Sequence, residues 1–200
     1  LVPGSNTVTV TVTAADGVTQ QVYTLFVVVA APSSDTTLSG VLVNGQAFTG
    51  ALDGTGTYEA SVGTTQVAVE ATPNSPAAQV SISGNTNLSV GSNNTVTIHV
   101  VAESGDVADY SFKVNVAAAN TNTGLSTFEI NSSAVTDGSV FNVPYGTTEV
   151  TINAVTSAAT STFTYTGNTG LTTGDNTVSV TVTSQAGTTS VHEVTVRVAA

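Results

Sequence analysis

The beginning of the chain alternates apolar and hydroxyl side chains with a period of two. Valines alternate with threonines between Asn6 and Thr13, and a second alternating run follows the Asp16-Gly17 pair. This period predicts two β-strands that each gather their apolar side chains on one face. The Asp-Gly pair predicts a tight turn between them, so the segment is predicted to be a hairpin. Its predicted apolar face consists of Val8, Val10, Val12, Tyr23, Leu25 and Val27.

The same hairpin pattern occurs three times along the chain. Each copy begins near Asn-Thr-Val, turns at a glycine and ends in Val-Ala-Ala. The matching asparagines give repeat periods of 88 residues (94 − 6) and 82 residues (176 − 94). Earlier parts of the unit occur twice, since "LSGVLVN" matches "LSTFEIN" and "YEASVGTTQVAVEA" matches "FNVPYGTTEVTINA". The three hairpin copies span Gly4–Ala31, Ser92–Ala119 and Gly174–Ala200.

These repeats predict one partial and two complete modules. Residues 1–31 are predicted to be the C-terminal hairpin of an incomplete repeat, and residues 32–119 and 120–200 to be complete β-sandwich repeats. Glycine, asparagine, aspartate and proline recur at the spacing typical of sandwiches, and no segment has helical periodicity. The predicted fold class is therefore all-β: tandem antiparallel β-sandwiches of about seven strands each, preceded by a partial domain. The short polar segments Ala31–Thr37 and Ala117–Gly124 are predicted to be linkers.

Charge is scarce, which narrows the classes of function. Charged residues make up 8% of the chain, against about 25% in an ordinary soluble domain. Two basic and 13 acidic residues give a net charge of −11, so nucleic acid and anionic membranes are not expected partners. The lack of cysteine excludes disulfides and thiol chemistry and favours a bacterial or archaeal source. No apolar run is long enough to span a bilayer. The chain does not begin with methionine and is expected to be a piece of a longer or processed product.

The order of motifs resembles a known module. A Leu-Ser-x-apolar-x-apolar-Asn segment is followed by a Tyr or Phe strand, a Gly-Thr-Thr-x-Val strand, a Gly-Ser-Asn strand and a closing Tyr-x-apolar strand. This set resembles the bacterial cadherin-like β-sandwich repeat, over essentially the whole chain. The resemblance implies an immunoglobulin-like sandwich, used outside the cell or at its surface as a spacer or adhesive unit, with no catalytic residue. The chain departs from the pattern at His192, which replaces the closing tyrosine, and in four extra residues between Asn44 and Tyr58.

The few residues able to do chemistry do not form a recognisable catalytic set. His99 is expected to face solvent, and His192 to be a half-buried ring with one nitrogen reaching a strand-end partner. Lys113 is expected on an outer face, which argues against an isopeptide bond. No Gly-x-Ser-x-Gly motif or Ser-His-acid set is present, so the chain is not expected to be an enzyme. Tyr145 and Tyr165 are candidates for exposed aromatic residues that line a binding groove.

Carboxylates near one predicted turn are candidate ligands of a cation. Glu103, Asp106 and Asp109 lie around that turn, and Asp53 is a further candidate, because Ca²⁺ takes six to eight oxygen ligands. No EF-hand loop is present, and aspartate also occurs at turns for backbone reasons. We therefore expect no metal or other cofactor, with Ca²⁺ as the less favoured alternative.

The predicted function is structural: a stalk, adhesin rod or filament subunit of a secreted bacterial surface protein. Two strands alone are marginal in water, so something must cover the hairpin's apolar face. The alternatives are the rest of a preceding module, or strands of a neighbouring identical subunit added by strand complementation. Phe26 and Val28 are apolar too, so both faces of the second strand are candidates for burial. The alternative function is a carbohydrate- or protein-binding accessory module of a secreted enzyme.

Overall fold

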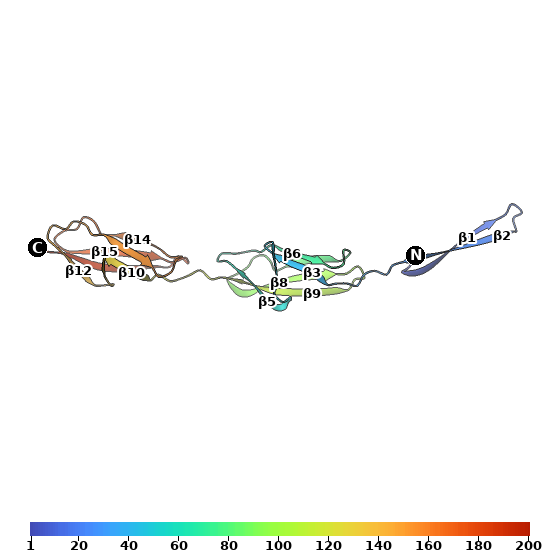
Figure 1. Ribbon diagram of the computed structural model, residues 1–200, viewed down its shortest axis with the longest axis horizontal. Coiled ribbons are helices and arrows are strands. Elements are labelled where there is room, and N and C mark those ends of the chain that lie inside the picture. Colours follow the sequence, from blue (N-terminus) through green and yellow to red (C-terminus); the bar gives the residue numbers. More distant parts are fainter. The chain divides into compact units, whose positions relative to one another are not determined.

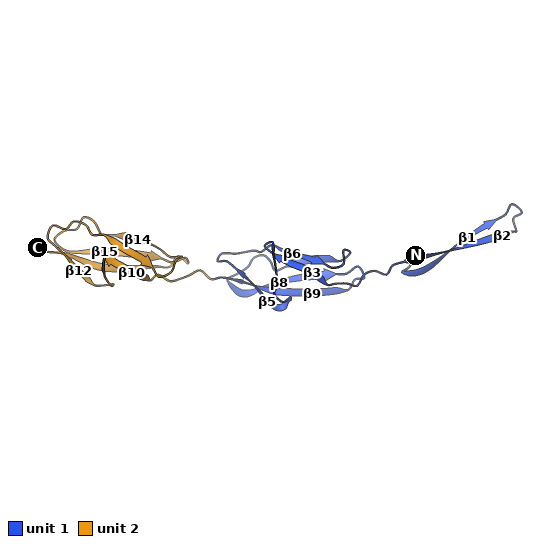
Figure 2. Ribbon diagram, viewed as in Figure 1, with its two compact units in different colours: residues 1–117 blue, residues 118–200 orange.

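The computed structural model describes all 200 residues and contains only strands, turns and irregular segments, so the all-β prediction is confirmed (Figure 1). Sixteen strands lie in two compact units, residues 1–117 and 118–200 (Figure 2). The structure holds no helix of the length and apolarity needed to cross a membrane.

The first two strands form a sheet of their own. Strands β1 (Gly4–Thr13) and β2 (Gln20–Val29) pair antiparallel over their whole length, with Val8 opposite Leu25 and Val10 opposite Tyr23. No other strand pairs with either of them. The apolar side chains predicted to share a face therefore do so, because directly opposed residues of an antiparallel pair lie on the same side.

The rest of the first unit is a sandwich of two sheets, in the orders β4-β3-β6 and β5-β9-β8-β7. Strand β5 pairs with β9 in parallel, whereas the other pairs are antiparallel, so one pair departs from the antiparallel prediction. The strands are β3 (Leu38–Val43), β4 (Gln46–Ala47), β5 (Asp53–Ala60), β6 (Val69–Pro73), β7 (Gln79–Ser83), β8 (Gly91–Val101) and β9 (Val107–Val116).

The second unit repeats this arrangement, with sheets ordered β11-β10-β13 and β12-β16-β15-β14 and a parallel β12–β16 pair. Its β12 has four residues where β5 has eight, and the pairing of β5 shifts register between Asp53 and Thr57. The strands are β10 (Leu125–Ile130), β11 (Ser133–Ala134), β12 (Val140–Val143), β13 (Ile152–Thr156), β14 (Thr162–Thr166), β15 (Gly174–Thr183) and β16 (Thr189–Val198).

Each sandwich has its own apolar core between its two sheets. Val96, Ile98 and Val100 of β8 are fully buried, and Phe112 of β9 packs on Phe48 with ring centroids 4.5 Å apart. In the second unit, alternate residues are buried in the C-terminal parts of β15 and β16: Val178, Val180, Val182, Val194, Val196 and Val198. The Val-Thr alternation thus produces what it predicts, a valine face inside and a hydroxyl face outside.

The segments predicted to be linkers form part of the modules. Ser33 bonds to the turn of the β8–β9 hairpin, where its carbonyl accepts from the Ser104 amide at 3.0 Å. Asn120 bonds in the same way to Ala186, in the turn between β15 and β16. Each module therefore begins beside the turn of its long hairpin. It ends at the far end of the last strand, where Val198 pairs with Gly174.

Candidate functional site

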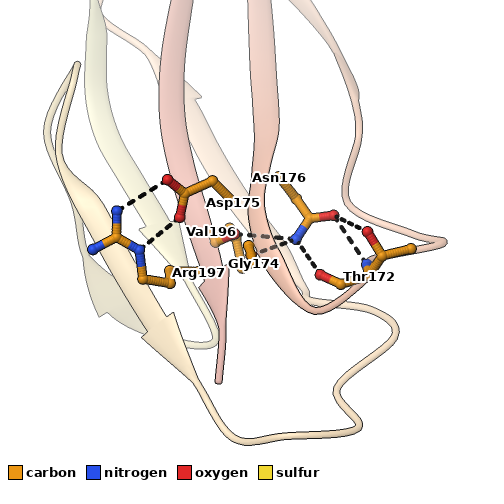
Figure 3. Close-up of polar contacts among 6 residues, drawn as sticks. All are labelled: Thr172, Gly174, Asp175, Asn176, Val196 and Arg197. Atoms are coloured by element: carbon orange, nitrogen blue, oxygen red, sulfur yellow. Dashed lines mark hydrogen bonds and ion pairs between the residues drawn. The ribbon is translucent and has the colours of Figure 1, made fainter. Parts of the chain in front are cut away.

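One asparagine closes the loop that leads into each long hairpin. The Asn176 amide nitrogen donates to the carbonyls of Thr172, Gly174 and Val196, at 2.7, 3.0 and 3.3 Å (Figure 3). Its Oδ1 accepts from the Thr172 backbone amide at 3.0 Å. We call these bonds the asparagine clasp, which ties the loop to β15 and the end of β16.

The clasp occurs in all three hairpins. Asn94 bonds in the same way to Ser89, Gly91 and Val114. Asn6 bonds to Val2, Gly4 and Val27. The glycine of each clasp has a φ of 98–100°, a left-handed conformation that favours glycine. The Gly-Ser-Asn-Asn sequence of the second copy has one extra residue, and the β8–β9 pairing shifts register there.

Beside the clasp of the second unit lies an ion pair that the other hairpins lack. Arg197 donates to both carboxylate oxygens of Asp175, at 2.6 and 3.0 Å, and both side chains are about half exposed (Figure 3). The hydrogen bond from Arg197 lowers the pKa of Asp175 below its usual value. A surface pair of this kind adds little to stability. The matching β2 and β9 residues, Val28 and Asn115, carry no charge.

The predicted interaction face of the first hairpin is open. Leu25 is 60% exposed, whereas Phe112 and Val194, which occupy the same position in β9 and β16, are 0% and 1% exposed. Five of the six predicted residues are exposed, and Val27 is half buried. The structure thus contains three copies of one hairpin, two covered by a second sheet and one uncovered.

Leu1 is a further residue of the open face, which the period-two alternation does not predict. The clasp places Leu1 at the position of Leu88 and Leu171, because each leucine directly precedes the residue that the asparagine binds. Leu88 and Leu171 are core residues at 8% and 6% exposure, whereas Leu1 is 81% exposed. The shared spacing Leu-x-x-Gly is the signal that identifies them.

The other face of β2 is apolar as well. Val22, Phe26 and Val28 are all more than half exposed. The residues that match Phe26 are Lys113 and Thr195, so the complete modules carry polar side chains there. The hypothesis that both faces of this strand are covered stays a prediction, since no residue of the structure buries either face.

His192 occupies the place of a tyrosine and makes the same contact. The Tyr110 hydroxyl donates to the Thr36 carbonyl at 3.2 Å, and His192 Nε2 lies 2.9 Å from the Thr123 carbonyl. The Nδ1 atom lies 2.7 Å from an Asp137 carboxylate oxygen. Both ring nitrogens thus face acceptors, and only the protonated ring donates from both. The expected half-buried ring with a strand-end partner is confirmed.

The stability of the second unit is expected to depend on pH through His192. Burial opposes the charge, but the Thr123 carbonyl and Asp137 together raise the pKa of His192 above 6.5. A raised folded-state pKa adds stability that is complete below the unfolded value and lost as pH rises through the folded value. The free energy of unfolding should therefore fall as pH rises above about 6.5, measured by denaturant-dependent hydrogen exchange in peptides of residues 118–200. His192→Tyr, which keeps the bond to Thr123, should flatten this dependence. An unchanged pH dependence in this variant would contradict the role of His192.

The candidate cation ligands have separate partners. Glu103 accepts from the Ser33 amide, Asp106 from the Ser104 hydroxyl, and Asp109 lies 2.6 Å from His99. Asp53 accepts from the amide and hydroxyl of Thr55, a common turn motif. No three histidine, aspartate or glutamate side chains in the structure are placed to share a metal ion. These carboxylates are therefore not brought together as a ligand set.

Exposed aromatic residues gather at one edge of the second unit. Phe163 and Tyr165 lie on β14 with ring centroids 6.5 Å apart and ring planes 26° from parallel. Both are opposite core valines of β15, but β14 is an edge strand and leaves them 37% and 46% exposed. Tyr165 lines an open cleft of about 420 Å³ together with Asn131, Glu149, Val150, Thr151, Ile152 and Asn168. Tyr145 is exposed but does not line this cleft.

The comparisons with known proteins assign no family. No family model matches the chain, and no curated protein matches it. Among solved structures, it is similar to the fibronectin(III)-like modules of CbhA from Clostridium thermocellum, at 12% identity and a TM-score of 0.25. That match covers 80% of this chain and 94% of the other. A score of this size does not establish a shared fold.

Proposed function

We propose that this chain is a non-catalytic structural segment of a secreted bacterial surface protein, in which tandem sandwich modules carry tension along their strands. The observation that supports it is the position of the two ends of each module. The chain enters beside the hairpin turn, at Asn120, and leaves beyond Val198 at the opposite end of the hairpin. Strands of ten residues separate these ends by roughly 30 Å.

This geometry loads the last strand in shear. A pull on the two ends of a module acts along β16, while the hydrogen bonds of its antiparallel pair with β15 are perpendicular to the strand. Strand β16 is bonded on both sides, by β12 in parallel and by β15 antiparallel. Many ladder bonds must then break together. The hydroxyl-rich, acidic surface suits such a segment, because it offers few basic groups for unspecific binding.

Pulling on the whole chain in a single-molecule force experiment should produce two unfolding events, one for each complete module. The second unit has 83 residues (118 to 200), so its event should lengthen the chain by roughly 25 nm. The β1–β2 hairpin has no covering sheet and should add no third event. Gradual extension without discrete events would contradict a load-bearing role.

A second candidate function is sugar binding by an accessory module of a secreted enzyme. The supporting observation is Tyr165, which stacks on Phe163 and lines the cleft together with Glu149 and Thr151. Apolar surface with a few convergent polar groups is typical of small-ligand sites. The corresponding β7 residues of the first unit, Val80 and Ile82, are aliphatic, so the candidate site belongs to the second unit alone.

If the cleft binds sugars, Tyr165→Ala should weaken retention on an insoluble polysaccharide by about 10-fold, the equivalent of 1.4 kcal/mol. The measurement is a depletion isotherm on cellulose and on other insoluble glycans. Tyr145→Ala is the matched control, because this tyrosine is exposed but lies outside the cleft. Equal retention of both variants and the unmodified chain would reject the cleft as the binding site.

A further inference from the structure

We propose that the open face of the β1–β2 hairpin is covered by five strands of the same repeat, supplied by polypeptide that precedes Leu1, which complete a third sandwich module. The inference rests on the proposed structural role and extends it, because a completed module would carry load like the other two. The partner is thus a segment equivalent to β3–β7. It is identified by the hairpin's edges, face and entry loop.

The hairpin is already fixed locally at both ends. The Asn6 clasp holds its entry loop, as in the complete modules. At its turn, the Asp16 carboxylate accepts from the Thr19 hydroxyl and from the amides of Val18 and Thr19. These bonds lower the pKa of Asp16 to about 2. The hairpin therefore has the register and turn of a finished module, and only its cover is lacking.

Each free edge of the hairpin matches an occupied edge elsewhere. Strands β8 and β15 are the equivalents of β1. On the edge that is free in β1, β8 pairs antiparallel with β7, and β15 pairs antiparallel with β14. Strands β9 and β16 are the equivalents of β2. On the edge that is free in β2, β9 pairs in parallel with β5, and β16 pairs in parallel with β12. A covering segment must thus supply one antiparallel strand along β1 and one parallel strand along β2.

The core positions match in the same way. Val8, Val10 and Val12 correspond to Val178, Val180 and Val182, which are fully buried. Strand β2 also carries large side chains at the core positions of its face. Tyr23 and Leu25 occupy the positions of Tyr110 and Phe112 in the first complete module. A three-stranded sheet of the kind formed by β3, β4 and β6 covers these positions in both complete modules.

The entry loop points to the preceding polypeptide as the source. The amide of Leu88 donates to the Thr65 carbonyl, and that of Leu171 to the Thr148 carbonyl. In both modules the covering strands come before the leucine in the chain and are joined to it directly. A second copy of the chain has no such strands free, because every strand from β3 to β16 already pairs within its own module. Covalent connection also gives the preceding segment a high effective concentration.

A graft tests this inference. A second copy of residues 32–87 is placed directly before Leu1, so that Leu1 follows it as Leu88 follows residue 87 in the native module. Hydrogen exchange of peptides from residues 5–29 is compared with the unextended chain. We expect exchange in the hairpin to slow by on the order of 100-fold. A second graft uses residues 118–170, since Leu1 also matches Leu171. Unchanged exchange in both grafted chains would overturn the proposal.

Matched variants show whether the apolar face is the one covered. Val10→Asp in the grafted chain should abolish the slow exchange, whereas Thr9→Asp, on the opposite face, should preserve it. Equal effects of the two substitutions would count against the proposal. Light scattering of the unextended chain tests the other source: a dimer with protected hairpin amides would assign the face to a second copy. None of these outcomes affects the two force events expected of the complete modules, so the two proposals fail separately.

Discussion

Phe112→Ala is expected to lower the free energy of unfolding of the first complete module by about 3–5 kcal/mol, the usual cost of removing a buried aromatic ring. The ring is fully buried and packs on Phe48, so alanine would leave a cavity between the two sheets. The measurement is denaturant-dependent hydrogen exchange in the whole chain, read in peptides of residues 38–116. Peptides of residues 118–200 report the second module and should not change.

Leu25→Ala is the matched control for that experiment. It removes an apolar side chain at the same position of the same hairpin pattern, but one that is 60% exposed. The expected change in the free energy of unfolding of the first complete module is below about 0.5 kcal/mol, as for other surface substitutions. A large loss in this variant would mean that the face of the first hairpin is buried in solution, which would contradict the open face described above.

Asn176→Ala is expected to lower the free energy of unfolding of the second module by about 2–3 kcal/mol, because it removes five side-chain hydrogen bonds, two of them to partly buried carbonyls. The carbonyls of Gly174 and Val196 are the partly buried ones. The measurement is hydrogen exchange in peptides of residues 118–200. The loss should be greatest in the loop that leads into β15, since the clasp holds it.

Two further variants separate the clasp from its surroundings. Asn176→Asp keeps the acceptor for the Thr172 amide but turns a carboxylate towards three carbonyl oxygens, so it should destabilise at least as much as alanine. Asp175→Asn changes the neighbouring exposed residue and should have little effect. If Asn176→Asp were as stable as the unmodified chain, the three donated bonds would have no role in stability.

Features that depend on neighbouring residues were predictable from sequence. The alternation of valine and threonine predicted the strands and their buried faces, because successive side chains of a strand point to opposite sides. The repeat of Asn6 at Asn94 and Asn176 aligned the three hairpins. That alignment also predicted the ring of His192 at a tyrosine position.

Features that join distant parts of the chain were not predictable. The parallel β5–β9 pair joins strands about fifty residues apart, and the sequence of neither strand indicates which strand it pairs with. The clasp needs carbonyls from a loop and from the neighbouring strand, so the repeated asparagine was visible but its role was not. The exposure of Phe163 was missed because its position in the alternation is that of a core residue, and only the place of β14 at a sheet edge leaves it open.

The positions of the two basic residues have a consequence for the chain's resistance to proteases. Trypsin-like proteases cut after lysine or arginine, and this chain has only Lys113 and Arg197. Both lie inside hydrogen-bonded strands, β9 and β16, rather than in the loops where proteolysis normally begins. Every turn, loop and connecting segment, and the whole open hairpin, is therefore without a tryptic site. Digestion by such a protease therefore requires that one of the two sandwiches unfold first, at least locally.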